Sequence, residues 1–322
     1  MKKINTISVL FTIFFLMVSC NSRTGDNTEK NGKNVKGEIS ISGAFALYPL
    51  TVMWAEEFNV EYPNIRIDIS AGGAGKGMAD ALSGMVDLGM FSREVSPEEE
   101  AKGAWKIAVA RDAVLPTCNP ANPLIDAIME QGLQKDQFRE IFLKTENHNW
   151  KDYFKSDRPE HMNVYTRSDA CGAAQMWGEY LGENQEELNG IGVYGDPGMA
   201  DAVKNDPMGL GYNNVIYIYN IKTREKYKGI SVIPIDLNEN DTVDPEEDFY
   251  HSLDSVMTAI KNGMYPAPPA RDLYFVARGT PEKPEVTLFL EWILTKGQNF
   301  VRKAGYVQLH EEKLSEELSK IQ

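Results

Sequence analysis

The chain has 322 residues, which is long enough for two domains of about 100–200 residues each. Hydrophobic residues make up 42% of it and charged residues 25%, a balance that is typical of a folded protein and excludes a disordered or fibrous one. The formal net charge of −14 disfavours nucleic acid and anionic lipid surfaces as partners, but it leaves room for a small anion in a local positive pocket.

The N-terminal segment is typical of a bacterial export signal. Two lysines precede a mostly apolar run, 9–18, which is shorter than the roughly 20 residues that span a bilayer. Residues 16–20, Leu-Met-Val-Ser-Cys, resemble a lipobox, which implies lipidation of Cys20. We therefore expect a signal peptide over 1–19 and a flexible polar tether over 20–37. An ordinary cleaved signal or an uncleaved anchor is the alternative.

The body of the chain alternates strand-like and helix-like segments. In chain order we predict a strand at 38–42, a helix at 49–62, a strand at 65–69, a helix at 78–84, strands at 86–90 and 106–115, helices at 125–131 and 136–144, a strand at 164–166, a helix at 174–181, strands at 210–219 and 230–235, a helix at 252–261, a strand at 272–276, and helices at 285–304 and 311–321. Strands and helices in such alternation are typical of an α/β protein with parallel sheets.

Two proline-rich crossings, after Leu115 and before Asp272, divide this body. They suggest that the chain leaves a first lobe and later returns to it. We expect lobe 1 to comprise 38–115 and 268–322, and lobe 2 to comprise 116–267. Two lobes joined by paired crossings form a hinge, and the cleft between them is the natural place for a ligand.

The sequence contains no motif that is typical of an enzyme active site, a metal site or a cofactor site. None of the four histidines recurs at metal-ligand spacing or accompanies a nucleophile motif. The glycine-rich segment 70–77 is not a P-loop, because it lacks the first glycine and has Gly77 where Ser or Thr follows the lysine. We interpret it as an anion-binding turn before a helix, with a plain tight turn as the alternative. Cys118 and Cys171 either form a disulfide or are two buried small side chains.

Nine short motifs occur in a characteristic order. They are Ile41-Ser42-Gly43-Ala44 with Tyr48-Pro49-Leu50; Gly72-Gly73-Ala74-Gly75-Lys76-Gly77-Met78; Val86-Asp87-Leu88-Gly89 followed by Ser92-Arg93-Glu94; Asn119-Pro120 with Asn122-Pro123; Ile141-Phe142 with Asn149-Trp150; Arg167-Ser168-Asp169-Ala170-Cys171-Gly172-Ala173; Gly209-Leu210-Gly211-Tyr212; Tyr265-Pro266 before Leu273-Tyr274; and Gly305-Tyr306-Val307. Together they resemble the phosphate-binding proteins of Pst-type ABC importers, within the type II periplasmic binding proteins.

The resemblance implies a fold and a role. The fold is an α/β fold of two lobes, each a mainly parallel sheet flanked by helices, joined by a two-strand hinge. The role is that of a lipid-anchored substrate-binding protein at the bacterial cell envelope. It would bind phosphate or a related oxyanion, deliver it to the permease of an ABC importer, act as a monomer, and catalyse no reaction.

The resemblance also implies which residues bind the ligand. Backbone N–H groups at helix N-termini, a hydroxyl group and an arginine paired with an aspartate would surround the oxyanion. The positions in this chain are Ala44, Phe45, Ala74, Gly75, Ser92, Arg93, Arg167, Asp169, Cys171, Gly172 and Ala173.

The chain departs from the family pattern at five of these positions. Ala44, Ala74, Cys171 and Ala173 stand where hydroxyl side chains are usual, and Arg93 stands where many members have an aspartate that accepts the proton of hydrogen phosphate. Four lost hydrogen bonds to a charged ligand would remove about 6–12 kcal/mol, compared with about 8 kcal/mol for micromolar binding. Sulfate, an organic anion such as a phosphonate, a ligand-free sensory or adhesive surface protein, and an exported phosphate-ester hydrolase therefore stay open as alternatives.

Overall fold

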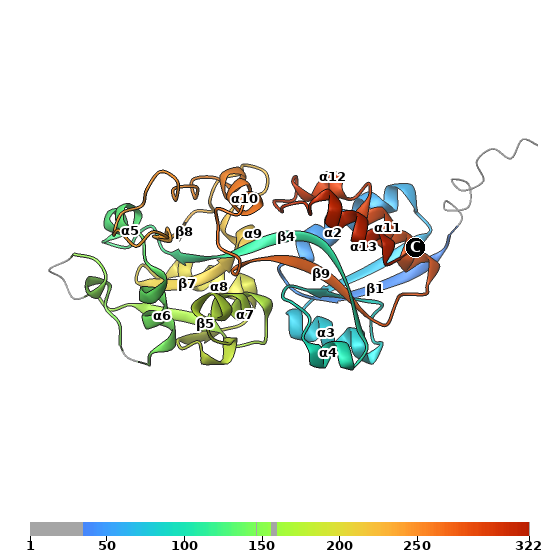
Figure 1. Ribbon diagram of the computed structural model, residues 1–322, viewed down its shortest axis with the longest axis horizontal. Coiled ribbons are helices and arrows are strands. Elements are labelled where there is room, and N and C mark those ends of the chain that lie inside the picture. The colour runs from blue at the N-terminus through green and yellow to red at the C-terminus, as the bar shows by residue number, and fades with distance from the viewer. Residues whose placement is uncertain (1–34, 146, 156–159, 322) are drawn as a thin grey trace, which may run out of the picture.

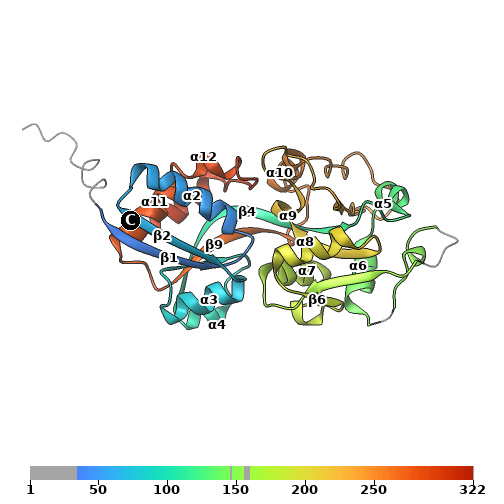
Figure 2. The same ribbon diagram turned by 180° about the vertical axis from the view of Figure 1, so that it is seen from behind.

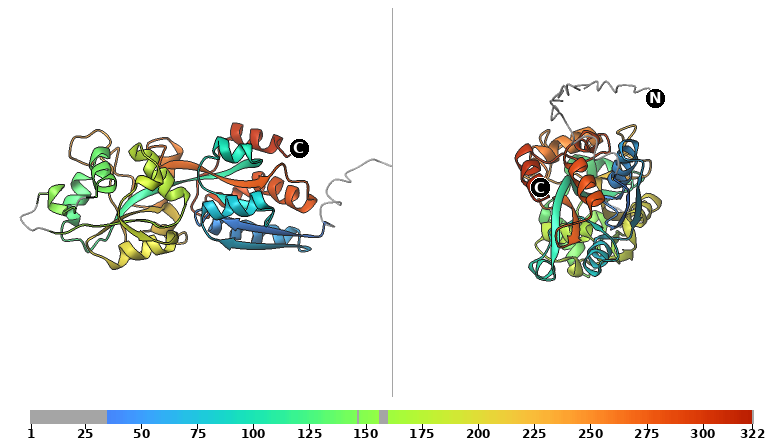
Figure 3. Two further views of the ribbon diagram at one scale, coloured as in Figure 1. Left: turned by 90° about the horizontal axis from the view of Figure 1, so that it is seen from below. Right: turned by 90° about the vertical axis from the view of Figure 1, so that its right-hand side faces the viewer.

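The computed structural model describes residues 35–145, 147–155 and 160–321. The predicted signal peptide, Cys20 and the tether up to residue 34 lie outside them. Two lobes stand side by side along the longest axis, and the long strands β4 (Ala104–Cys118) and β9 (Ala270–Arg278) run from one lobe into the other (Figures 1 and 3). Within the described ranges no helix combines the length and the apolar character needed to cross a bilayer.

The chain forms lobe 1, then lobe 2, and then returns to lobe 1. Before β4 the elements are β1 (Gly37–Gly43), α2 (Tyr48–Glu61), β2 (Ile65–Ala71), α3 (Ala74–Ser83), β3 (Leu88–Phe91) and α4 (Pro97–Ala101). Between β4 and β9 they are α5 (Ile125–Gln131), α6 (Lys135–Leu143), η1 (Trp150–Asp152), β5 (Asn163–Arg167), α7 (Gly172–Leu181), η2 (Gln185–Glu187), β6 (Ile191–Val193), α8 (Gly195–Asn205), β7 (Gly209–Asn214), α9 (Val215–Ile218), β8 (Ser231–Val232) and α10 (Leu253–Lys261). After β9 they are α11 (Pro284–Leu294), α12 (Gln298–Val301) and α13 (Glu311–Ser319).

One sheet continues through both lobes, with the strand order β2-β1-β3-β9-β4-β7-β5-β6 and β8 beside β4. The outer strands are parallel in each lobe: β2-β1-β3 in lobe 1 and β7-β5-β6 in lobe 2. The pairs that involve the hinge strands β4 and β9 are antiparallel. The expected parallel pairing is thus confirmed away from the hinge, and the antiparallel pairs of the hinge strands make the sheet mixed.

Each lobe has its own hydrophobic core. Trp54 and Phe275 are buried in lobe 1, and Trp150 and Trp177 are buried in lobe 2. Both hinge strands pass from one core to the other. In β4, Ala110 packs in the core of lobe 1 while Ala113 packs in that of lobe 2.

Several elements differ from the predictions. The predicted strand 210–219 ends at Asn214 and continues as helix α9, because a short apolar run does not distinguish a strand from a buried helix. The predicted strand 230–235 is reduced to β8. The predicted helix 285–304 breaks after Leu294, where Gly297 packs closely against the backbone of Ile293.

Helix boundaries near glycine and proline were the hardest to predict. Helix α3 begins at Ala74, so glycines that were expected in a turn belong to its first turn. Helix α8 was missed, because its opening Gly-Asp-Pro-Gly has the composition of a turn, although proline is well tolerated in the first turn of a helix. The short elements α4 and β6 were missed as well.

Candidate functional site

Segments of both lobes meet between the starts of α3 and α7. The Gly75 N–H donates to the carbonyl oxygen of Ala170 over 3.4 Å, and the Tyr217 hydroxyl donates to the carbonyl oxygen of Phe45 over 3.1 Å. The Phe45 ring packs edge-on against Tyr194, with 6.2 Å between the ring centroids. Since these contacts join loops of lobe 1 to loops of lobe 2, the lobes are closed on each other at this place.

Glycine permits this close approach. A Cβ atom on Gly172, at the start of α7, would lie 2.1 Å from the carbonyl oxygen of Ser92 in lobe 1. On Gly73, just before α3, it would lie 3.1 Å from a carboxylate oxygen of Asp169, and the positive φ of 89° also favours glycine there. The two helix N-termini are therefore brought together by positions that exclude a side chain.

The backbone N–H groups of the predicted site fall into two sets. Three of them already donate to protein acceptors: Ala44 to the Met90 carbonyl at 2.9 Å, Gly75 as above, and Cys171 to Gln185 Oε1 at 3.1 Å. Within the described residues, the other four have no protein acceptor; they belong to Phe45, Ala74, Gly172 and Ala173. Free N–H groups at the first turn of a helix carry its positive dipole end and are suited to binding an anion.

Arg167 lies at the end of β5 with its side chain only 1% exposed. Its Nε and Nη2 donate to the two carboxylate oxygens of Asp169 at 2.8 and 2.7 Å, and its Nη1 donates to Asp196 Oδ1 at 2.5 Å. Burial alone would lower the pKa of Arg167, but the carboxylates of Asp196 and Asp169 outweigh it and raise that pKa. The guanidinium therefore stays charged, and three of its five N–H donors are in use.

Asp196 is a member of this site that the sequence interpretation missed. It lies in the first turn of α8, and the N–H of its neighbour Gly195 donates to Asp169 Oδ1 at 3.1 Å. Burial raises the pKa of Asp196, and the charge of Arg167 opposes that rise. An acidic residue after a glycine at a helix start is a recognisable signal, but the helix itself had not been predicted.

Ser92 and Arg93 follow β3 and have different surroundings. Ser92 is buried beside Gly172, and its hydroxyl has no hydrogen-bond partner in the described part of the chain. Arg93 donates from Nη1 and Nη2 to the carboxylate of Glu99 at 2.9 and 2.7 Å, and it lies 4.5 Å over the ring of Phe91. Arg93 thus contacts residues of its own lobe, and it is not part of the proposed ligand set.

Cys118 and Cys171 are buried free thiols. Cys171 immediately precedes α7, and its Sγ accepts the N–H of Ala174 at 3.4 Å, as a serine would at a helix N-cap. Burial raises the pKa of Cys171 to about 11 and that of Cys118 to about 12. Across the described ranges no group of three or more His, Cys, Asp or Glu side chains is placed to hold a metal ion.

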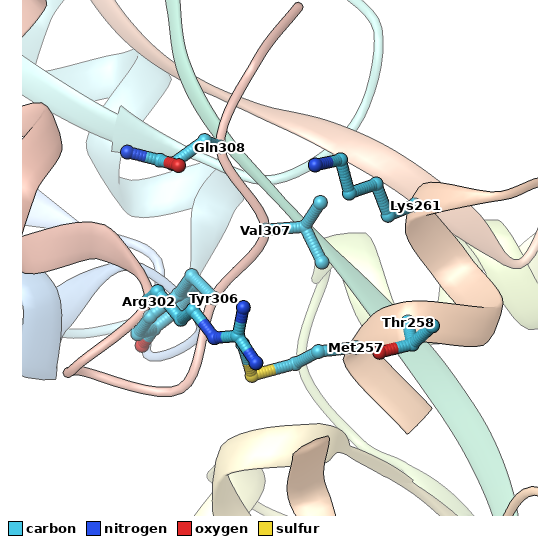
Figure 4. A pocket seen from close by; sticks show the side chains of 7 residues that line it. All are labelled: Met257, Thr258, Lys261, Arg302, Tyr306, Val307 and Gln308. Atoms are coloured by element: carbon cyan, nitrogen blue, oxygen red, sulfur yellow. The ribbon is translucent and has the colours of Figure 1, made fainter. Parts of the chain in front are cut away.

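A pocket between the lobes lies away from this site. It is lined by Thr258 and Lys261 of α10 and by a C-terminal segment with Arg302 and Gln308 (Figure 4). Helices α10 and α12 lie on one side of the hinge strands, and α3 and α7 lie on the other (Figures 1 and 2). Arg302 is 70% exposed and lies 3.6 Å from Asp254, so this pocket lacks the buried cation of the first site.

Comparison with known proteins places the chain in a family. Residues 28–296 match the family described as the PBP superfamily domain. The phosphate-binding protein PstS of Bacillus subtilis is 26% identical over 239 residues, which are 72% of this chain and 76% of that protein. PstS of Pseudomonas aeruginosa is 26% identical over 307 residues, covering 87% of this chain and 85% of that protein.

Solved structures share the fold, while the family assignment rests on the match over residues 28–296. A putative phosphate ABC transporter substrate-binding protein from Clostridium perfringens, solved with bound phosphate, is similar with a TM-score of 0.69 at 22% identity, over 85% of this chain and 100% of that one. An ABC-type phosphate transport receptor from Vibrio cholerae is similar with a TM-score of 0.60 at 17% identity, over 84% of this chain and 100% of that one. The chain therefore belongs to the PBP superfamily.

Proposed function

We propose that this protein is the substrate-binding component of an ABC importer and that it binds phosphate between its two lobes. One observation carries the proposal: the starts of α3 and α7, with unpaired N–H groups, meet between the lobes, and the carboxylate that holds the buried Arg167 lies next to the start of α3. The named relatives support it, since they are phosphate-binding proteins of the same superfamily.

The proposed ligand set is smaller than the one expected from the resemblance. It comprises the N–H groups of Phe45, Ala74, Gly172 and Ala173, the hydroxyl of Ser92, and the two unused N–H donors of Arg167. Asp169 holds the guanidinium of Arg167 in place through two parallel hydrogen bonds. At Ala74 and Ala173, backbone N–H groups would therefore donate to the ligand in place of the side-chain hydroxyls that are usual there.

The cellular setting is part of the same proposal. Export, lipidation at Cys20 and a tether up to residue 37 would hold the protein at the outer face of a membrane, where an ABC permease receives the ligand. The chain would cross between the lobes near 115/116 and 267/268, act as a monomer, and catalyse no reaction.

Calorimetric titration of phosphate tests the proposal. The full-length protein is first unfolded and refolded to remove any ligand carried from the cell. We expect one phosphate to bind per chain. The absence of binding heat at millimolar phosphate would overturn the proposal, and the compound released on unfolding would then be identified by mass spectrometry.

A further inference from the structure

Five buried charged side chains form a cluster that extends from the anion site to the hinge. Arg167 holds Asp169 and Asp196, as described above. Behind them, Arg271 of β9 donates from Nε and Nη2 to Asp112 of β4 at 2.8 and 3.2 Å, and these two residues are cross-strand partners. All five side chains are at most 13% exposed.

The cluster carries one more negative than positive charge. Two guanidinium groups and three carboxylates give a formal charge of 2 − 3 = −1. The charged pairs next to the site do not change this balance, because Arg93 is paired with Glu99 and Lys76 with Asp80. A bound anion would therefore be placed beside a buried site that is already negative, and the helix N-termini contribute only partial charges of about +0.5 each.

Asp196 is the group in this cluster with a free proton-accepting atom. Its Oδ1 accepts from Arg167, whereas no hydrogen bond from the described residues reaches Oδ2. The titratable and charged groups that face Asp196 are Arg167 of β5, Asp169 and Cys171 of the loop and N-cap before α7, Arg271 of β9, Asp112 of β4, Tyr217 of α9, and Tyr306 of the C-terminal segment. Burial raises the pKa of Asp196 and of Asp112. Because burial disfavours the charged form of a carboxylate, a proton taken up by the cluster would be held on one of these two buried carboxylates.

We propose that Asp196 is a positioning residue that sets the charge of the anion site. The cleft closes on a dianionic oxyanion only when one proton is taken up from solvent. Oδ2 of Asp196 holds that proton. The proposal rests on the proposed function. It distinguishes anions by their charge: a monoanion such as H2PO4⁻ needs no proton uptake, whereas a dianion such as sulfate or HPO4²⁻ does.

Titration of two anions into the full-length protein tests this inference. Phosphate and sulfate are each titrated over a range of pH, in two buffers with different ionisation enthalpies, to count the protons taken up. For sulfate we expect about one proton per bound anion and an affinity that falls about tenfold per pH unit. For phosphate we expect the same proton uptake and the same fall in affinity with pH only at pH values where free phosphate is the dianion.

Asp196→Asn removes the surplus charge and keeps an oxygen that accepts from Arg167. In this variant we expect proton uptake to vanish and sulfate affinity to become independent of pH. The matched control is Asp201→Asn in the same helix, a carboxylate that is 70% exposed, and it should behave as the parent does. Thermal melts of both variants establish that they are folded.

Each outcome has a definite meaning. Binding without proton uptake in the parent would overturn the inference and leave the proposed function intact. Uptake that persists in Asp196→Asn would overturn the assignment to Asp196. If neither anion binds to the parent at any pH, the proposed function fails first, and this inference falls with it.

Discussion

Two arginines stand at or just past the ends of parallel strands, one in each lobe, and they have different surroundings. Arg167 ends β5 in lobe 2; it is almost completely buried and is held by Asp169 and Asp196. Arg93 comes after β3 in lobe 1; it is 23% exposed and forms an ion pair with Glu99. The partners of Arg167 use three of its five N–H donors, whereas Arg93 stacks on Phe91 of its own lobe. The carboxylate partners of the two arginines therefore distinguish the proposed ligand group, Arg167, from Arg93.

Replacement of Arg167 should have the largest effect. Arg167→Ala removes the two hydrogen bonds expected to reach the ligand, at about 1.5–3 kcal/mol each, so phosphate affinity should fall at least about 100-fold. It also leaves two buried carboxylates without their cation, which should lower the free energy of unfolding by about 3–5 kcal/mol. Titration and urea unfolding measure the two effects, and an unchanged affinity would exclude Arg167 from the site.

Gly172→Ala should separate closure from folding. The new Cβ would lie 2.1 Å from the Ser92 carbonyl oxygen, so the lobes should be held apart, although alanine is well suited to the first turn of a helix. We expect phosphate binding to be lost, with melting behaviour close to that of the parent. Small-angle X-ray scattering should show no compaction on addition of phosphate. Compaction with unchanged affinity would contradict the contact that brings α7 against β3.

Ser92→Ala tests the one hydroxyl group of the proposed site. The loss of one hydrogen bond to a charged ligand, about 1.5–3 kcal/mol, should weaken phosphate binding by roughly 10- to 150-fold. Ser96→Ala is the matched control, because its hydroxyl caps α4 and its loss should affect stability by about 1 kcal/mol but not affinity. Equal affinities for the two variants would remove Ser92 from the ligand set.

Arg93→Gln should have the smallest effect and completes the comparison of the two arginines. It breaks a partly exposed ion pair, which should cost about 1 kcal/mol of stability at most. Because Arg93 is turned toward Glu99, we expect less than about a threefold change in phosphate affinity. A loss comparable to that of Arg167→Ala would show that Arg93 turns into the cleft when the ligand binds.

The sequence predicts the local secondary structure of this molecule better than it predicts the contacts between its two lobes. The strand predicted at 38–42 and the helix predicted at 49–62 depend on neighbouring residues, and β1 and α2 lie close to where they were expected. The direction of Arg93 depends on Glu99, and the approach of Gly172 to Ser92 joins positions far apart in the chain. Asp196 was missed because Gly-Asp-Pro-Gly indicates a turn by composition, while its tertiary contacts make it the start of a helix.

A crystal structure of the protein grown with phosphate would test the central claim most directly. We predict one phosphate between the lobes, within hydrogen-bond distance of the Gly172 and Ala173 N–H groups, the Ser92 hydroxyl and the Arg167 guanidinium. A phosphate bound only in the pocket between Lys261 and Arg302, or at no ordered position, would contradict the account.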